Sequence, residues 1–132
     1  MIAFAQIRCL RILIGGFLAE LAVFAFVIPI SIHFGKHSLL YTAPPASMVA
    51  CFLFALWVGR RIDSQFILHG FLVGVVATLI YVGLTRGGPE PAAYLLAHGL
   101  KMLGGAAGGF VMGLRYKAAH DKRTGSAAPI QG

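Results

Sequence analysis

The sequence predicts an all-α polytopic membrane protein with four transmembrane helices in an antiparallel up-down bundle and both termini in the cytoplasm. The chain has 132 residues, of which 58% are hydrophobic and only 11% charged, and its mean hydropathy is +0.83. A soluble domain carries about 25% charged residues. Four separate apolar runs are each close to the roughly 20 residues that a helix needs to cross the hydrocarbon layer. Lipid is therefore the expected medium of most of this chain.

The four helices are expected at 9–32, 44–59, 65–85 and 91–116. The first apolar run is longer than the 7–15-residue core of a secretory signal and contains Glu20, so we interpret it as a retained helix. Pro44-Pro45 suits the start of the second helix, where a missing N–H removes no hydrogen bond.

Polar and Gly/Pro-rich segments separate the later helices. Gly59-Arg60-Arg61 ends the second helix, and Asp63 or Ser64 provides an N-cap for the third. The stretch 85–91 is dense in glycine and proline and breaks the chain before the fourth helix. Residues 1–117 therefore form a four-helix transmembrane domain, and 118–132, which are small, polar and without periodicity, are expected to be a disordered cytoplasmic tail.

The charge distribution sets the expected orientation. The net charge is +7, and cations flank the apolar runs. With the N-terminus inside, the inner side carries Arg8, Arg11, Arg60, Arg61, Arg115, Lys117, Lys122 and Arg123, whereas the outer side carries Lys36 and Arg86. This asymmetry follows the positive-inside rule. Because no base-reading module accompanies the positive charge, we expect the lipid bilayer as partner and no nucleic acid.

Glycines are the clearest positional pattern. They recur at helical spacing on three of the predicted helices: Gly15 and Gly16 on the first, Gly70 and Gly74 on the third, and Gly104, Gly105, Gly108, Gly109 and Gly113 on the fourth. Small residues four apart let helix backbones approach closely in lipid. The pattern predicts either tight packing within one chain or, on the fourth helix, contact with a second subunit as well.

Two ionisable residues lie deep in the predicted helices. Glu20 is about 14 Å in from Arg11, and Lys101 about 21 Å in from Arg115, at 1.5 Å per residue. An isolated charge at such depth costs about 2.5–3.5 kcal/mol on insertion scales. We therefore expect the small faces of the first and fourth helices to meet and Glu20 to pair with Lys101. The pair is either a structural ion pair or a site for a proton, an ion or a polar ligand.

The histidines suggest other chemistry. His69 is expected near the depth of Glu20, where it is either a proton relay or a satisfied bundle histidine, and His98 is one turn from Lys101. Bis-histidine haem is not expected, because the two would differ in depth by about 13 Å. No cysteine–histidine spacing for a metal is present, so the expected cofactors and metal ligands are none.

The sequence does not identify a reaction. It contains no HExxH, GxSxG or P-loop motif, so we do not expect an enzyme. The favoured interpretation is an accessory or scaffolding membrane protein that assembles, through glycine-rich helix faces, with copies of itself or a larger membrane complex. The alternative is a minimal oligomeric transporter or channel for protons or small solutes that uses Glu20, His69, His98 and Lys101.

An internal repeat is a further possibility from the sequence. Gly16-Phe17-Leu18 recurs as Gly70-Phe71-Leu72, and the same offset relates Arg61 to Arg115. A true duplication would pair the first helix with the third and the second with the fourth, as parallel repeats about an axis along the membrane normal. Apolar sequences also match by chance, so both explanations remain open at this stage.

Overall fold

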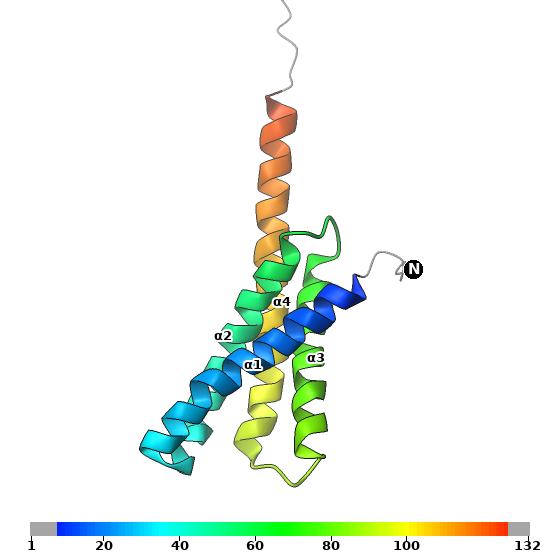
Figure 1. Ribbon diagram of the computed structural model, residues 1–132. Helices are drawn as coiled ribbons and strands as arrows, with labels where there is room; N and C mark the ends of the chain where they lie inside the picture. Colours follow the sequence, from blue (N-terminus) through cyan, green and yellow to red (C-terminus); the bar gives the residue numbers. More distant parts are fainter. Residues whose placement is uncertain (1–7, 127–132) are drawn as a thin grey trace, which may run out of the picture.

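The computed structural model describes residues 8–126, and these are all-helical, with no strands. The elements are α1 (Cys9–Phe34), the short 3-10 helix η2 (Lys36–Ser38), α2 (Leu39–Gly59), α3 (Phe66–Thr85) and α4 (Ala92–Gly125) (Figure 1). Four helical segments are long and apolar enough to span a membrane. The predicted all-α class with four candidate spanning helices is therefore confirmed for the described part of the chain.

The second helix begins earlier than expected. α1 ends at Phe34 and is followed by Gly35, whose φ of 82° favours glycine. α2 starts at Leu39, so Pro44 and Pro45 lie inside the helix. Each proline removes one backbone hydrogen bond. The first turn is retained because Leu39 packs against the buried cluster around Val23, and membrane helices tolerate such prolines.

The fourth helix continues past its predicted end. Residues 118–125, expected to be a disordered tail, are helical, while 127–132 lie outside the described residues. Alanine, lysine and arginine are strong helix formers, and the ring of Tyr116 stacks on that of His120 one turn later, with centroids 6.5 Å apart. The last turns of α4 extend beyond the other three helices (Figure 1).

The four helices form a diamond-shaped bundle in which α2 and α3 lie between the other two. α1 and α4 each pack against both α2 and α3, but their backbones do not approach one another. Where α1 and α3 end, α1 and α2 lean away from α3 and α4 (Figure 1). Because α2 contacts α3 while α4 does not contact α1, the bundle lacks the twofold arrangement that parallel repeats would produce.

The glycines of α4 are occupied by contacts within the chain. Gly104 and Gly108 lie against the α2 backbone, and Gly105 and Gly109 against the α3 backbone. A Cβ on Gly105 would collide with the carbonyl oxygen of Gly70, and one on Gly74 would lie 2.5 Å from the carbonyl oxygen of Lys101. Two adjacent glycine rows thus let α4 fit between α2 and α3.

The small face of α1 does not meet that of α4, so the expected meeting of these faces is wrong. A Cβ on Gly15 would lie 2.7 Å from Val58, and one on Gly16 would lie 2.5 Å from Val76. Those valines belong to α2 and α3. Because α2 and α3 already fill the grooves along both glycine rows of α4, α1 packs on their other side.

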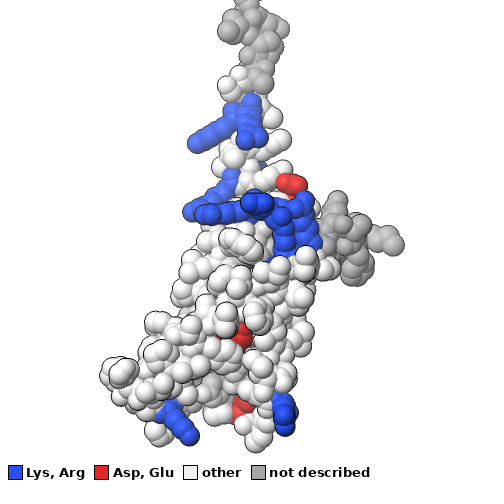
Figure 2. All heavy atoms as spheres, in the orientation of Figure 1, with Lys and Arg blue, Asp and Glu red and all other residues white. Residues whose placement is uncertain are grey.

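The outer surface separates apolar from basic regions. Large apolar side chains such as Leu21, Phe26 and Leu95 are more than half exposed. Lysine and arginine gather around the end where α1 and α3 begin, and a few lie at the opposite end (Figure 2). The first is called here the basic end, defined by Arg8, Arg11, Arg60, Arg61, Arg115 and Lys117; the other is the distal end, where α1 and α3 finish.

Candidate functional site

An ion pair lies at the centre of the bundle. Nζ of Lys101 donates to Oε2 of Glu20 at 2.7 Å, and both side chains are only 2% exposed. The two residues come from α4 and α1, whose backbones are not in contact, so the long lysine side chain bridges the gap between them. The structure thus brings together the two residues that the sequence analysis expects to pair.

A chain of aromatic and ionisable groups leads from this pair toward the distal end. Nζ of Lys101 lies 4.9 Å from the centre of the Tyr81 ring, within the range of a cation–π contact. The Tyr81 ring lies 5.0 Å from the His98 ring. Nε2 of His98 lies 3.2 Å from Oε2 of Glu90, which precedes α4. The side chains of His98 and Glu90 are 12% and 16% exposed, so the chain of groups runs from the buried centre to the edge of the protein.

A cavity is lined by the same groups except Glu90. Its volume is about 160 Å³, and its polar lining comes from Glu20, Ser31, Ser47, Tyr81, Tyr94, His98 and Lys101. It also extends along α1 to Ser31, close to the distal end of that helix. Nδ1 of His98 is buried without a hydrogen-bond partner among the described residues. Buried polar atoms are normally satisfied by protein or water, and a cavity with this lining has the size and polar partners that water requires.

On the other side of the ion pair the bundle is apolar. Ala19, Cys51 and Ala77 are fully buried beside it. Closer to the basic end, Ile12, Val58, Ile62 and Val73 form a second buried cluster, with exposures between 0% and 4%. Apart from the Cys51 thiol, which is only a weak hydrogen-bonding group, these side chains are alkyl and do not continue the path. The two clusters together are called here the apolar plug.

His69 is separated from the site by this plug, so the structure does not bring it near Glu20. The backbone N–H of Arg8 donates to Nε2 of His69 at 3.4 Å, and the neutral ring then donates from Nδ1 to the carbonyl oxygen of Gln65 at 2.8 Å. Arg8 precedes Glu20 by about 18 Å of helix at 1.5 Å per residue. His69 therefore connects the beginnings of α1 and α3 and takes no part in the polar chain.

Two members of the polar chain were not among the sequence candidates. These are Tyr81, near the end of α3, and Glu90, in the Gly/Pro-rich stretch that precedes α4. A usable signal was present on α4, because Tyr94, His98 and Lys101 lie four and three residues apart and share one face. This face contacts Tyr81, whose ring stacks on that of Tyr94 with centroids 6.1 Å apart. These contacts depend on tertiary packing, which the sequence does not reveal.

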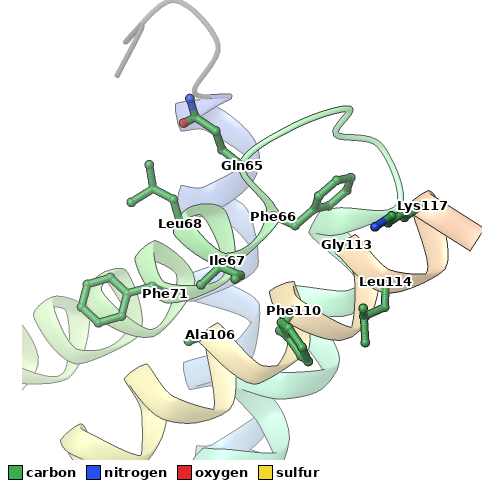
Figure 3. A pocket seen from close by; sticks show the side chains of 10 residues that line it. All are labelled: Gln65, Phe66, Ile67, Leu68, Phe71, Ala106, Phe110, Gly113, Leu114 and Lys117. Carbon is green, nitrogen blue, oxygen red and sulfur yellow. The ribbon is translucent and has the colours of Figure 1, made fainter. Parts of the chain in front are cut away.

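A larger, apolar groove lies between α3 and α4, toward the basic end (Figure 3). Its volume is about 740 Å³, and it is lined by Phe66, Ile67, Phe71, Ala106, Phe110 and Leu114, with Gln65 and Lys117 at its edge. Gly113 also faces this groove, with Phe66 3.5 Å from the position of an added Cβ. The groove offers shape and apolar area and has no cluster of reactive groups.

Metal binding has no support in the geometry: the part of the chain that the structure describes has no group of three or more His, Cys, Asp or Glu residues that could hold an ion. Comparisons with protein-family models, curated proteins and solved structures found no match. The ion pair, the cavity and the surface are therefore the features from which a function can be inferred.

Proposed function

We propose that this chain is a minimal membrane transporter in which the Glu20–Lys101 pair binds and releases a proton. The observation that carries the proposal is a series of contacts from the edge of the bundle to its centre. Its members are Glu90, His98, Tyr81, Lys101 and Glu20, and all but Glu90 line one cavity. Ionisable residues inside a membrane commonly mark ion and proton pathways. Histidine and carboxylate groups in contact are suited to passing protons.

The size of the cavity favours a proton over a larger solute. Pockets for drug-sized ligands have volumes of about 300–1,000 Å³, whereas this cavity has about 160 Å³. At about 30 Å³ for each water, it has room for a short file of water molecules. Such a file would connect His98 with the ion pair without direct contact between their polar atoms.

The apolar plug favours a carrier over an open channel. The polar chain reaches the pair from the distal end, and the buried side chains on the other side are alkyl except for the Cys51 thiol. A proton that enters by this path must leave by it unless the helices rearrange. We therefore expect a slow, saturable flux that requires movement of α1 or α4 relative to α2 and α3.

The orientation follows from the cations. Six of the lysines and arginines define the basic end, and the positive-inside rule assigns that end, with both termini, to the cytoplasm. In this arrangement the cavity opens away from the cytoplasm, and in a bacterial inner membrane it would face the periplasm. The pair would then be loaded with protons from outside.

Proton flux in liposomes tests the proposal. The purified protein is reconstituted with a pH-sensitive dye inside, and an imposed pH gradient is followed with valinomycin and potassium present to prevent charge build-up. Wild type should collapse the gradient faster than empty liposomes, Glu20→Gln and Lys101→Met should abolish the difference, and Glu90→Gln should slow it. Lys36→Met, which removes a lysine that does not line the cavity, should behave as wild type. Absence of flux in wild type, or undiminished flux in Glu20→Gln, would refute the proposal.

A second candidate is an accessory subunit that assembles through α4, and the α3–α4 groove is the observation that favours it. The glycine rows of α4 are used inside the chain, so assembly would require the outer face of α4, where Ala106 and Gly113 line the groove. Ala106→Leu would fill it. If this candidate is correct, the mass of the complex purified in mild detergent falls in Ala106→Leu while Ala93→Leu, outside the groove, leaves it unchanged.

A further inference from the structure

A second cavity, at the basic end, carries a different chemistry. It lies between the beginning of α1 and the end of α2, has a volume of about 480 Å³, and is lined by Arg11, Arg60, Arg61, Leu10, Ile14 and Trp57. Three guanidinium groups thus border one hollow. It is separate from the proton path, which opens at the distal end.

The arginines are held by fixed backbone. Arg11 lies in the first turn of α1, and its N–H bonds to the carbonyl oxygen of Arg8 at 3.0 Å. The N–H groups of Arg60 and Arg61 bond to the carbonyl oxygens of Leu56 and Val58 at 3.2 and 3.3 Å. The next residue, Ile62, is 4% exposed and anchors this turn in the apolar plug. The three side chains therefore start from positions that packing defines.

The positive charge of this cavity is not neutralised by the described part of the protein. None of the three arginines forms an ion pair with a described carboxylate. Asp63 follows in the same loop, is exposed, and does not line the cavity. Guanidinium groups present a planar set of donors that matches a phosphate in two-point contact.

The remaining walls are suited to lipid. Leu10, Ile14 and Trp57 are 70%, 40% and 48% exposed and lie beside the arginines. An aromatic ring such as Trp57 is typical of the level where acyl chains meet headgroups. A free phosphate would use the arginines and leave these apolar side chains without a role, whereas a phospholipid would contact both.

We propose that this cavity binds an anionic phospholipid, with its phosphate between Arg11, Arg60 and Arg61 and an acyl chain along Leu10, Ile14 and Trp57. Basic pockets between transmembrane helices are known to hold such headgroups. The lipid would join the beginning of α1 to the end of α2, next to the plug that closes the proton path. The site does not depend on proton transport and can be tested separately.

Trp57 makes the test direct, because it is the only tryptophan in the chain. The protein is placed in phosphatidylcholine nanodiscs that contain a minor fraction of a lipid with brominated acyl chains. This brominated lipid is phosphatidylglycerol in one sample and phosphatidylcholine in the other, and the tryptophan emission of both samples is recorded. Bromine quenches only at close range. Brominated phosphatidylglycerol should quench more strongly than brominated phosphatidylcholine at the same fraction.

Matched variants identify the groups responsible. Arg60→Gln/Arg61→Gln should weaken the preference about 25-fold, since each cation near an anionic surface contributes about fivefold. Lys122→Gln/Arg123→Gln removes the same charge from the exposed end of α4 and should keep the preference. Arg60→Lys/Arg61→Lys keeps the positive charge and the topology signals. Its preference for the anionic lipid should lie between those of wild type and the glutamine variant.

Three outcomes would overturn the proposal. Equal quenching by the two brominated lipids would mean that the cavity does not select an anionic headgroup. If the preference for the anionic lipid persists in Arg60→Gln/Arg61→Gln, other cations are responsible for it. Recovery of emission when inorganic phosphate replaces chloride at constant ionic strength would identify a soluble anion as the ligand.

Discussion

Lys101 connects α4 to α1 across a gap that no backbone contact closes. Its amine is satisfied by Glu20 at 2.7 Å and lies over the Tyr81 ring at 4.9 Å. Removal of one member of a buried pair leaves an uncompensated charge, which commonly costs more than the pair contributes. If the proposed function holds, the pair therefore affects both stability and proton binding through the same two atoms.

Single and double substitutions separate these effects. Lys101→Met leaves Glu20 alone and should lower the free energy of unfolding by about 3–5 kcal/mol. Glu20→Gln/Lys101→Met, which leaves no charge, should be more stable than Lys101→Met alone. Reversible unfolding in mixed micelles measures both. A double variant less stable than either single variant would contradict the ion-pair interpretation.

His69 gives the complementary prediction. It joins the beginnings of α1 and α3 and lies on the basic side of the plug. His69→Leu should lower the free energy of unfolding by about 0.5–1.5 kcal/mol, because it removes the hydrogen bond from the backbone N–H of Arg8, whereas the carbonyl oxygen of Gln65 still accepts from the backbone N–H of residue 69. Proton flux per folded molecule should remain that of wild type. A flux reduced to that of Glu20→Gln would place His69 in the proton path after all.

At this scale the sequence could predict the residues whose burial is expensive. Glu20 and Lys101 are conspicuous because a charge in an apolar helix needs a partner. Tyr81 and Glu90 are not, because tyrosine is common at helix ends and Glu90 precedes its helix in a Gly/Pro-rich segment. Their roles appear only once packing places them beside His98.

At the scale of the helices, α4 is distinguished by two adjacent rows of glycine. Gly105 and Gly70 face each other so closely that neither tolerates a Cβ without separation of the helices. Gly99, on the same helix, has open space around it. The two positions therefore form a pair for comparison within one helix.

Gly105→Ala should lower the free energy of unfolding by about 1–3 kcal/mol, the range for overpacked interiors. Gly99→Ala should be neutral or stabilising by up to about 1 kcal/mol, because alanine favours helix over glycine. Thermal melting followed by circular dichroism compares them. Equal effects at the two positions would mean that helix propensity, and not the close approach of α3 and α4, decides the outcome.

The helix ends were the least predictable part of the fold. Pro44-Pro45 looks like a helix start in sequence, yet Leu39 extends α2 because its side chain has a buried cluster to pack against. The segment 118–125 looks like a tail because it is polar, yet polarity alone does not prevent helix where propensity is high. Hydropathy located the helices, but tertiary contacts and local propensity determined where they begin and end.

For the whole molecule, the proposed orientation predicts which residues a reagent outside the cell can reach. In a Cys9→Ser background, a cysteine at Gly88 should react with a membrane-impermeant maleimide in intact cells, and one at Ala119 only after the cells are opened. Gly88 lies in the α3–α4 loop and Ala119 on the projecting end of α4, and both are exposed. The reverse labelling pattern would show that the protein has the opposite orientation, in which the cavity opens toward the cytoplasm.

Because the end of α4 projects beyond the other helices, a small tilt of this helix produces a large displacement of its tip. α4 has 34 residues, or about 51 Å of helix, against roughly 30 Å of hydrocarbon. From Lys101 to Gly125 it is continuous over about 36 Å, so a tilt of about 10° around the ion pair would displace its tip by roughly 6 Å. A spin label at the tip would therefore magnify rearrangements too small to resolve at the pair itself.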